Sequence, residues 1–126
     1  MTPREKWLQL LRDPRHTKGI MYLRPTSEDT AKTRCYCVLG LGAIALGYKF
    51  LRSREATDFH PCIRAKDGKL YYNHLPEFML EELGLDVKTT QNLVFLNDQT
   101  DLTLADLAEI IEAEAINRVA AKELAK

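Results

Sequence analysis

The sequence predicts an α+β fold: a single compact domain over residues 1–126, in which a small antiparallel sheet of two to four strands packs with about five helices. Three observations lead to this prediction. Segments at both ends of the chain carry helix-capping residues followed by apolar residues at helical spacing. Two short β-prone runs flank Asp67-Gly68, a pair that suits a tight turn. The chain has 126 residues and is 45% apolar, which is enough for one hydrophobic core.

The first helix is predicted by its end signals. Thr2 is a candidate N-cap, Pro3 fits the first helical position, and Glu5 completes a capping box. The Asp13-Pro14 pair then ends the helix, because a proline disfavours the helical backbone conformation of the residue before it.

The middle of the chain predicts strands, a loop and one buried helix. Residues 19–24 (GIMYLR) are expected to form a short strand, and residues 26–34 a polar loop. Residues 36–50 are apolar on every side, which indicates a short buried helix. Residues 59–73 are expected to form a hairpin that turns at Lys66-Asp67-Gly68.

Two helices are predicted after the hairpin. The first begins at Pro76 and stops at Gly84, a residue type that commonly follows a helix end. The second covers residues 89–98, and Asn97 and Asp98 are interpreted as the turn that ends it.

The last predicted helix is the longest. It opens at Thr103, with Asp106 as the capping-box partner, and is expected to run through residues 104–125. Its apolar stripe weakens toward the C-terminus. The turns after about residue 116 are therefore expected to fray or to reach a partner.

Residues 35–45 (CYCVLGLGAIA) contain the spacing of a dinucleotide-binding turn at Gly40, Gly42 and Ala45. That motif needs a following parallel strand that ends in an acidic residue, and too little chain remains for a doubly wound sheet. We therefore interpret the glycines as small residues that allow close helix packing.

The cysteines allow three hypotheses. Cys35, Cys37, His60 and Cys62 could supply zinc ligands, with His74 in reserve. Cys37 could be a nucleophile at a helix N-terminus, with His60 or His74 as its base. Three cysteines are an odd number, and an apolar segment buries its thiols, so we expect reduced, inert thiols. No metal and no cofactor are expected.

The formal net charge of zero conceals an asymmetry, because residues 1–76 carry +7 and residues 77–126 carry −7. The basic part contains a candidate anion-binding set, in which arginine favours bidentate contacts. The alternative is that these residues are dispersed over the surface and serve solubility. The candidate residues are Arg12, Arg15, His16, Lys18, Arg24, Arg34 and Arg64.

The acidic part contains a candidate partner-binding set: Glu109, Glu112 and Glu114. Between Glu77 and Glu114 there are 10 acidic residues against the single Lys88, which argues against DNA recognition by these helices. An acidic face can instead contact a basic protein surface, and an ordinary solvated helix face is the alternative.

The order of these segments resembles a family of small proteins encoded by bacteriophages and prophages. The matching segments are Lys6-Trp7, Leu23-Arg24, and residues 36–41, 75–85 and 93–112, which together span about residues 6–112. Val38 stands where the family has its second cysteine, and Leu104 where it prefers phenylalanine. The resemblance implies a phage setting and a compact α+β fold, but no reaction and no catalytic residue.

The resemblance and the phage setting it implies favour a phage-encoded accessory protein that binds and antagonises or modulates a host defence component. It would act without catalysis, through a host bacterial protein or by sequestering a small anionic ligand, in the host cytoplasm and outside the membrane. One alternative is a small enzyme that acts on a nucleotide or nucleic acid. Another is a homo-oligomeric structural or assembly protein, with the exposed end of the last helix as its interface.

Overall fold

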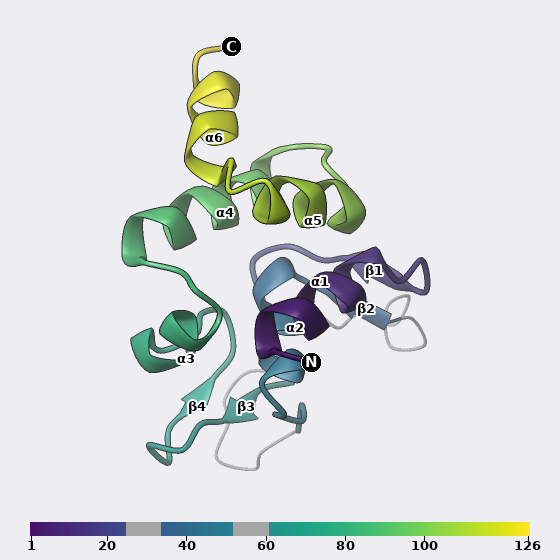
Figure 1. Ribbon diagram of the computed structural model, residues 1–126. Helices are drawn as coiled ribbons and strands as arrows, with labels where there is room; N and C mark the ends of the chain where they lie inside the picture. Colours follow the sequence, from purple (N-terminus) through teal and green to yellow (C-terminus); the bar gives the residue numbers. More distant parts are fainter. Residues whose placement is uncertain (25–33, 52–60) are drawn as a thin grey trace.

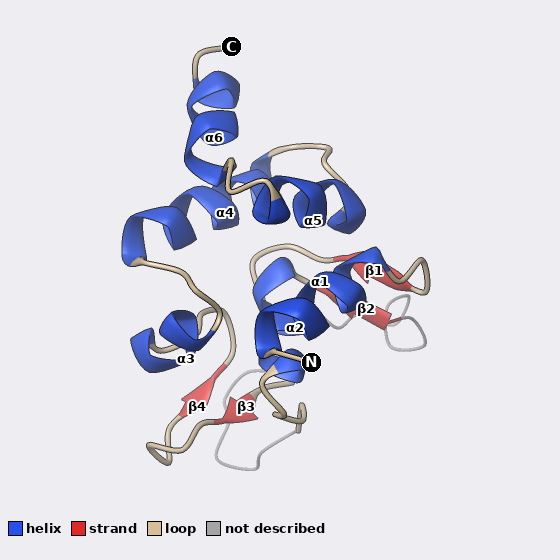
Figure 2. Ribbon diagram, viewed as in Figure 1, coloured by secondary structure: helices blue, strands red, loops and turns tan. Residues whose placement is uncertain are grey.

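The structure is a computed structural model that describes residues 1–24, 34–51 and 61–126. Within these ranges the chain forms six helices and two two-stranded sheets, and the predicted α+β class is confirmed (Figures 1 and 2). In chain order the elements are α1 (Pro3–Arg12), β1 (His16–Lys18), β2 (Arg34–Tyr36), α2 (Val38–Ala45), β3 (Ile63–Arg64), β4 (Leu70–Tyr71), α3 (Glu77–Glu82), α4 (Val87–Gln99), α5 (Leu104–Glu112) and α6 (Ile116–Leu124).

The two strand pairs differ in direction. β3 and β4 are antiparallel, as the Asp67-Gly68 turn predicts, and Gly68 has a positive φ of 82°. β1 and β2 are parallel, with His16 opposite Arg34. The prediction of antiparallel pairing is therefore wrong for this pair.

The strand predicted at residues 19–24 is also wrong, because β1 precedes it. Gly19 N–H makes the last bond to β2, donating to the Tyr36 carbonyl over 2.8 Å. The chain then turns at Met21, whose φ is +70°. Further on, Leu23 N–H donates to the Tyr72 carbonyl over 2.7 Å, which ties this segment to the end of β4.

α1 begins and ends as its sequence predicts. Thr2 Oγ1 accepts a hydrogen bond from Glu5 N–H over 3.1 Å, and Asp13 follows the last helical residue. Trp7 is completely buried and donates from Nε1 to the Val38 carbonyl over 2.8 Å. This bond joins α1 to the beginning of α2.

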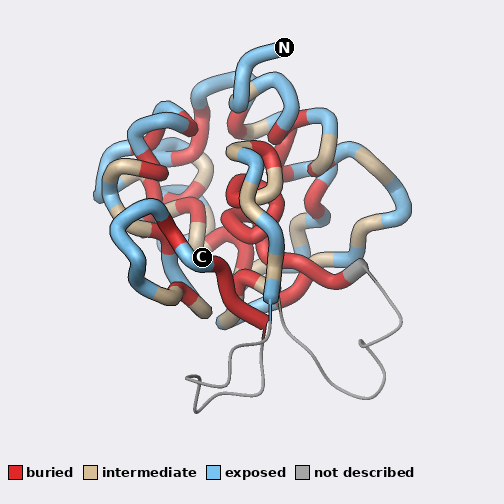
Figure 3. The backbone as a smooth tube through the Cα atoms, turned by 90° about the horizontal axis from the view of Figure 1, so that it is seen from below, coloured by how far each residue is buried: buried red, intermediate tan, exposed pale blue. Residues whose placement is uncertain are grey.

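α2 is the central buried helix, and Figure 3 shows how the buried segments gather inside the outer turns of the chain. All of its residues except Ile44 are buried. It ends at Ala45 rather than near Phe50, since Gly47 leaves the helix with a φ of +94°. None of the helices in the described ranges combines the length and apolar character needed to cross a membrane.

α3 and α4 follow the predicted order. Gly84 has a φ of +79° and closes α3, as predicted for a residue after a helix end. Asp86 is the N-cap of α4, and its side chain accepts a hydrogen bond from Thr89 N–H. The helix begins at Val87 and continues to Gln99. The turn predicted at Asn97-Asp98 is therefore wrong, because both residues belong to α4.

The long C-terminal helix is two helices. The capping box at Thr103 and Asp106 starts α5 as predicted, but the helix ends after Glu112. Glu114 then adopts a left-handed conformation with φ +54°, and α6 begins at Ile116. The prediction of one uninterrupted helix is wrong, because α6 packs back onto α4 and buries Ile116 and Ala120.

Candidate functional site

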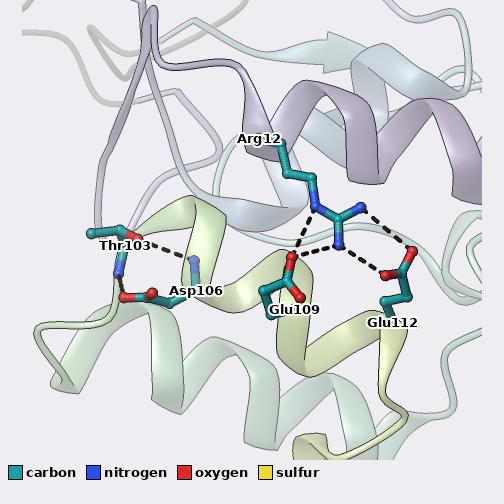
Figure 4. A network of polar contacts seen from close by, with 5 residues as sticks. All are labelled: Arg12, Thr103, Asp106, Glu109 and Glu112. Atoms are coloured by element: carbon teal, nitrogen blue, oxygen red, sulfur yellow. Dashed lines mark hydrogen bonds and ion pairs between the residues drawn. The ribbon is translucent and has the colours of Figure 1, made fainter.

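Residues from both predicted binding sets meet at one place. Arg12 at the end of α1 donates to the carboxylates of Glu109 and Glu112 on α5, with closest distances of 2.8 and 3.0 Å (Figure 4). These hydrogen bonds, led by the one to Glu112, raise the pKa of the Arg12 guanidinium. The capping box of Thr103 and Asp106 holds the first turn of the same helix. We call Arg12, Glu109 and Glu112 the α1–α5 clasp.

Arg15 lies near the clasp but has a different partner. Its guanidinium donates to both carboxylate oxygens of Asp13, the closest pair being 2.7 Å apart. This side-chain hydrogen bonding holds the pKa of Asp13 far below its ordinary value. Arg12 and Arg15 also line a surface groove of about 820 Å³ beside α1, together with Lys6, Asp13 and Glu112. Each arginine in this groove therefore has a carboxylate from the protein itself.

His16 and Lys18 on β1 contact neighbouring elements. His16 Nδ1 lies 2.7 Å from the Leu10 carbonyl, and its ring meets Tyr36 edge-on. Lys18 Nζ donates to the carbonyls of Thr100 and Leu102 in the α4–α5 loop. Burial lowers the pKa of Lys18, and nearby aspartates partly oppose that effect.

The other predicted basic residues lie apart from the groove. The Arg24 guanidinium is 5.0 Å from the Tyr36 ring centroid, a cation–π geometry. Arg64 donates to the Gly68 carbonyl inside the β3–β4 turn over 2.8 Å. Arg34 pairs with His16 through the backbone, and its side chain lies outside the described residues, as does all of His60. Anion binding by the seven residues stays a prediction.

Glu114 is the one residue of the acidic set outside the clasp. Its side chain is exposed, and it occupies the left-handed position between α5 and α6. Partner binding by Glu109, Glu112 and Glu114 also stays a prediction.

The glycines of residues 35–45 pack against other elements. A Cβ added at Gly40 would overlap the Leu23 carbonyl oxygen, and one at Gly42 would lie 2.7 Å from Leu83 Cδ1. The start of α2 is also occupied, because Val38 N–H donates to Asn97 Oδ1 and Gly40 N–H to Cys37 Sγ. The packing interpretation is confirmed, and these two amides already have protein acceptors where a pyrophosphate would bind.

Cys37 serves as the N-cap of α2. Its sulfur is buried and accepts from Gly40 N–H over 3.3 Å. Burial raises the pKa of Cys37 to about 12 and also raises that of Cys35. Cys35, Cys37 and Cys62 are buried, and none of them forms a disulfide. Among the described residues, no group of three or more His, Cys, Asp or Glu residues is arranged to hold a metal ion.

These facts predict slow alkylation of Cys37. Compared with a thiol at the ordinary pKa of 9.0, a pKa of about 12 lowers the thiolate fraction at pH 8 about a thousandfold, before steric protection adds to the effect. Iodoacetamide labelling followed by tandem mass spectrometry, which separates position 37 from position 35, measures the rate. The same protein unfolded in guanidinium is the control. Native labelling as fast as the unfolded rate would contradict a buried cap.

Two features were missed by sequence reasoning. Arg4 donates to the carbonyls of Leu83 and Ile111 over 3.1 and 3.0 Å, and so joins α1 to the ends of α3 and α5. The sequence predicts a strand at Ile20 and Met21, yet both residues lie outside the strands and are exposed. No local sequence signal marks either feature, because both depend on where distant segments lie.

Comparison of the chain with protein-family models, with curated proteins and with solved structures found no significant match. The resemblance to phage and prophage proteins therefore stays a prediction.

Proposed function

We propose that this chain is a phage-encoded accessory protein that binds a host protein, and thereby antagonises or modulates a host defence component without catalysis. The observation that supports this proposal is an exposed apolar pair, Ile20 and Met21, which are 48% and 68% exposed. Methionine is enriched at the centres of protein interfaces, and exposed apolar groups mark interaction sites when they gather. We call Ile20 and Met21 the apolar tip.

The backbone of the apolar tip is unusual. Met21 has a φ of +70°, and Tyr22 N–H donates to the Ile20 carbonyl over 2.9 Å. This γ-turn geometry is strained for a residue with a side chain and costs about 1–3 kcal/mol. Because the Met21 side chain is largely exposed, contacts within this chain do not offset that cost. Burial against a partner would.

Buried groups hold the tip in place. Asn97 Nδ2 donates to the Gly19 carbonyl over 2.9 Å, immediately before the tip. Asn97 itself is 1% exposed and belongs to α4. A tip that is anchored to the core loses little conformational freedom on binding, which favours affinity.

The clasp favours a protein partner over a sequestered anion. Arg12 and Arg15 already contact carboxylates of the same chain. A small anionic ligand at Arg12 or Arg15 would have to replace Glu109, Glu112 or Asp13 as the acceptor. A host protein can instead bind the tip while these ion pairs remain intact.

The experiment compares three tagged proteins in pull-downs from a bacterial host lysate: wild type, Met21→Gly and Val87→Ala. Glycine adopts a φ of +70° without strain, so Met21→Gly removes the side chain and retains the fold. Val87 is a matched exposed apolar residue, 53% exposed, on α4. We expect one host protein to be enriched by wild type and by Val87→Ala, and its affinity for Met21→Gly to fall at least tenfold.

Titration calorimetry with the purified host protein then measures that difference directly. Equal binding by Met21→Gly and wild type would exclude the tip as the contact. Enrichment of no protein, together with co-purification of a nucleotide, would replace the proposal with the anion-sequestering alternative.

A further inference from the structure

The junction between α5 and α6 has the geometry of a helix end but lacks the residues that favour one. Glu114 N–H donates to the Ile111 carbonyl and Ala115 N–H to the Ile110 carbonyl, both over 3.0 Å. This pair of bonds is a Schellman motif, in which the left-handed residue is usually glycine. Here that residue is Glu114, with a φ of +54°.

α3 supplies an internal comparison. It ends with the same two bonds, from Gly84 N–H to the Glu81 carbonyl and from Leu85 N–H to the Leu80 carbonyl, both over 2.9 Å. Its left-handed residue is a glycine, with a φ of +79°. The two junctions therefore differ in strain, because a left-handed conformation is unfavourable for a residue that has a Cβ.

The start of α6 is also weak. Its N-cap is Ala115, which provides no side-chain acceptor for the first free N–H groups of the helix. In one continuous helix the N–H groups of residues 116–118 would bond to the carbonyls of residues 112–114. Ala113, Glu114 and Ala115 all tolerate such a helix, because alanine and glutamate are good helix formers.

α6 itself is a peripheral element. Figure 1 shows it projecting away from α1 and α2, with the C-terminus at its far end. It packs on α4, where Asn92 Nδ2 donates to Asn117 Oδ1 over 2.7 Å and Asn117 Nδ2 to Thr89 Oγ1 over 3.3 Å. If α6 moves away, it exposes a surface of α4 that is complementary to the α6 of another copy.

We propose that this chain forms a domain-swapped dimer, in which α5 and α6 join into one helix and the α6 of each copy packs on the α4 of its partner. The contacts between α6 and α4 are the same in the monomer and in the swapped dimer, so none of them is lost in the exchange. The exchange removes the strain of the left-handed Glu114 backbone, and it gives the uncapped N–H groups at the start of α6 hydrogen-bond acceptors, in both chains. Short hinges under strain favour such an exchange. The joined helix over residues 104–124 would be about 30 Å long.

Disulfide trapping tests the exchange directly. Asn92→Cys and Asn117→Cys chains are purified separately, unfolded and refolded together at high concentration, and oxidised. We expect a covalent heterodimer on a non-reducing gel, because position 92 of one chain meets position 117 of the other only after exchange. Each variant refolded alone controls for the native cysteines. The double variant in one chain, examined as the monomer, shows that the pair can close. If the double variant closes within the monomer and the mixture gives no heterodimer, the exchange is excluded.

Hinge variants test the cause. Glu114→Gly removes the backbone strain at the α5–α6 junction of the monomer, and it weakens the joined helix of the dimer. We expect the dimer dissociation constant, measured by analytical ultracentrifugation, to rise about a hundredfold, or about tenfold for each of the two hinges. Ala113→Gly weakens the joined helix without relieving a positive φ, and its effect should be clearly smaller. Equal effects of the two glycines, or a wild type that stays monomeric at every concentration, would overturn the proposal.

Discussion

Gly40→Ala is expected to abolish folding. A Cβ at this position would overlap the Leu23 carbonyl oxygen and lie 2.8 Å from the Leu23 carbonyl carbon, and both are backbone atoms. Leu23 cannot retreat easily, because its carbonyl accepts from Cys37 N–H and its own N–H donates to the Tyr72 carbonyl. The methyl group would therefore push α2 away from the segment that contains Leu23, and would strain the bond between that segment and Tyr72. We expect a loss of more than about 4 kcal/mol in the free energy of unfolding, which is comparable to the whole stability of a small domain.

Circular dichroism and guanidinium denaturation measure this loss, and Gly42→Ala is the matched control on the same helix. Its Cβ would meet the side-chain atom Leu83 Cδ1 at 2.7 Å, and a side chain can move. We expect Gly42→Ala to fold with a loss of about 1–3 kcal/mol, as for an overpacked core. A Gly40→Ala protein as stable as Gly42→Ala would show that α2 does not pack against Leu23 in this way.

Asn97→Leu is expected to lower the free energy of unfolding by about 2–5 kcal/mol. Asn97 Oδ1 accepts from Val38 N–H over 3.0 Å, and Asn97 Nδ2 donates to the Gly19 carbonyl over 2.9 Å. Leucine has similar volume but leaves both buried backbone groups without these partners. Each unsatisfied buried group costs about 1–3 kcal/mol.

Two further variants separate the contributions in urea denaturation. Asn97→Asp keeps an acceptor for Val38 N–H, but it places a buried carboxylate against the Gly19 carbonyl and Asp98, to which Asn97 Nδ2 donates. At neutral pH it should therefore be at least as destabilised as Asn97→Leu. Asn92→Ala, also on α4, removes only the exposed hydrogen bond to Asn117 and should cost less than about 1 kcal/mol. If Asn97→Leu costs no more than Asn92→Ala, Asn97 does not join α4 to α2 and to the apolar tip.

These two residues illustrate how far sequence reasoning reached. It placed Gly40 correctly in a buried, closely packed helix, because the surrounding residues are apolar on every side. It could not name Leu23 as the neighbour, since 17 positions of chain separate the two residues. It misplaced Asn97 in a turn, because asparagine is typical of turns and its two distant backbone partners are invisible in the local pattern.

The candidate site also combines features that the sequence predicts with features that it does not. Charge composition correctly separated a basic part from an acidic part. Treating them as two independent sites missed that Arg12 of the first contacts Glu109 and Glu112 of the second. The apolar tip was missed because an isoleucine and a methionine in a β-prone run read as strand residues.

The sequence by itself determined the α+β class, the ends of α1 and α3, the start of α5, the β3–β4 turn and the burial of α2. These features depend on interactions within a few residues: side-chain caps, a glycine after a helix, a tight turn and an apolar run. Only the tertiary structure decided the parallel β1–β2 pair, the break at Glu114, the clasp and the exposure of Met21. Each of these depends on a contact between segments far apart in the chain, and such contacts override local propensity whenever they bury more surface or satisfy more polar groups.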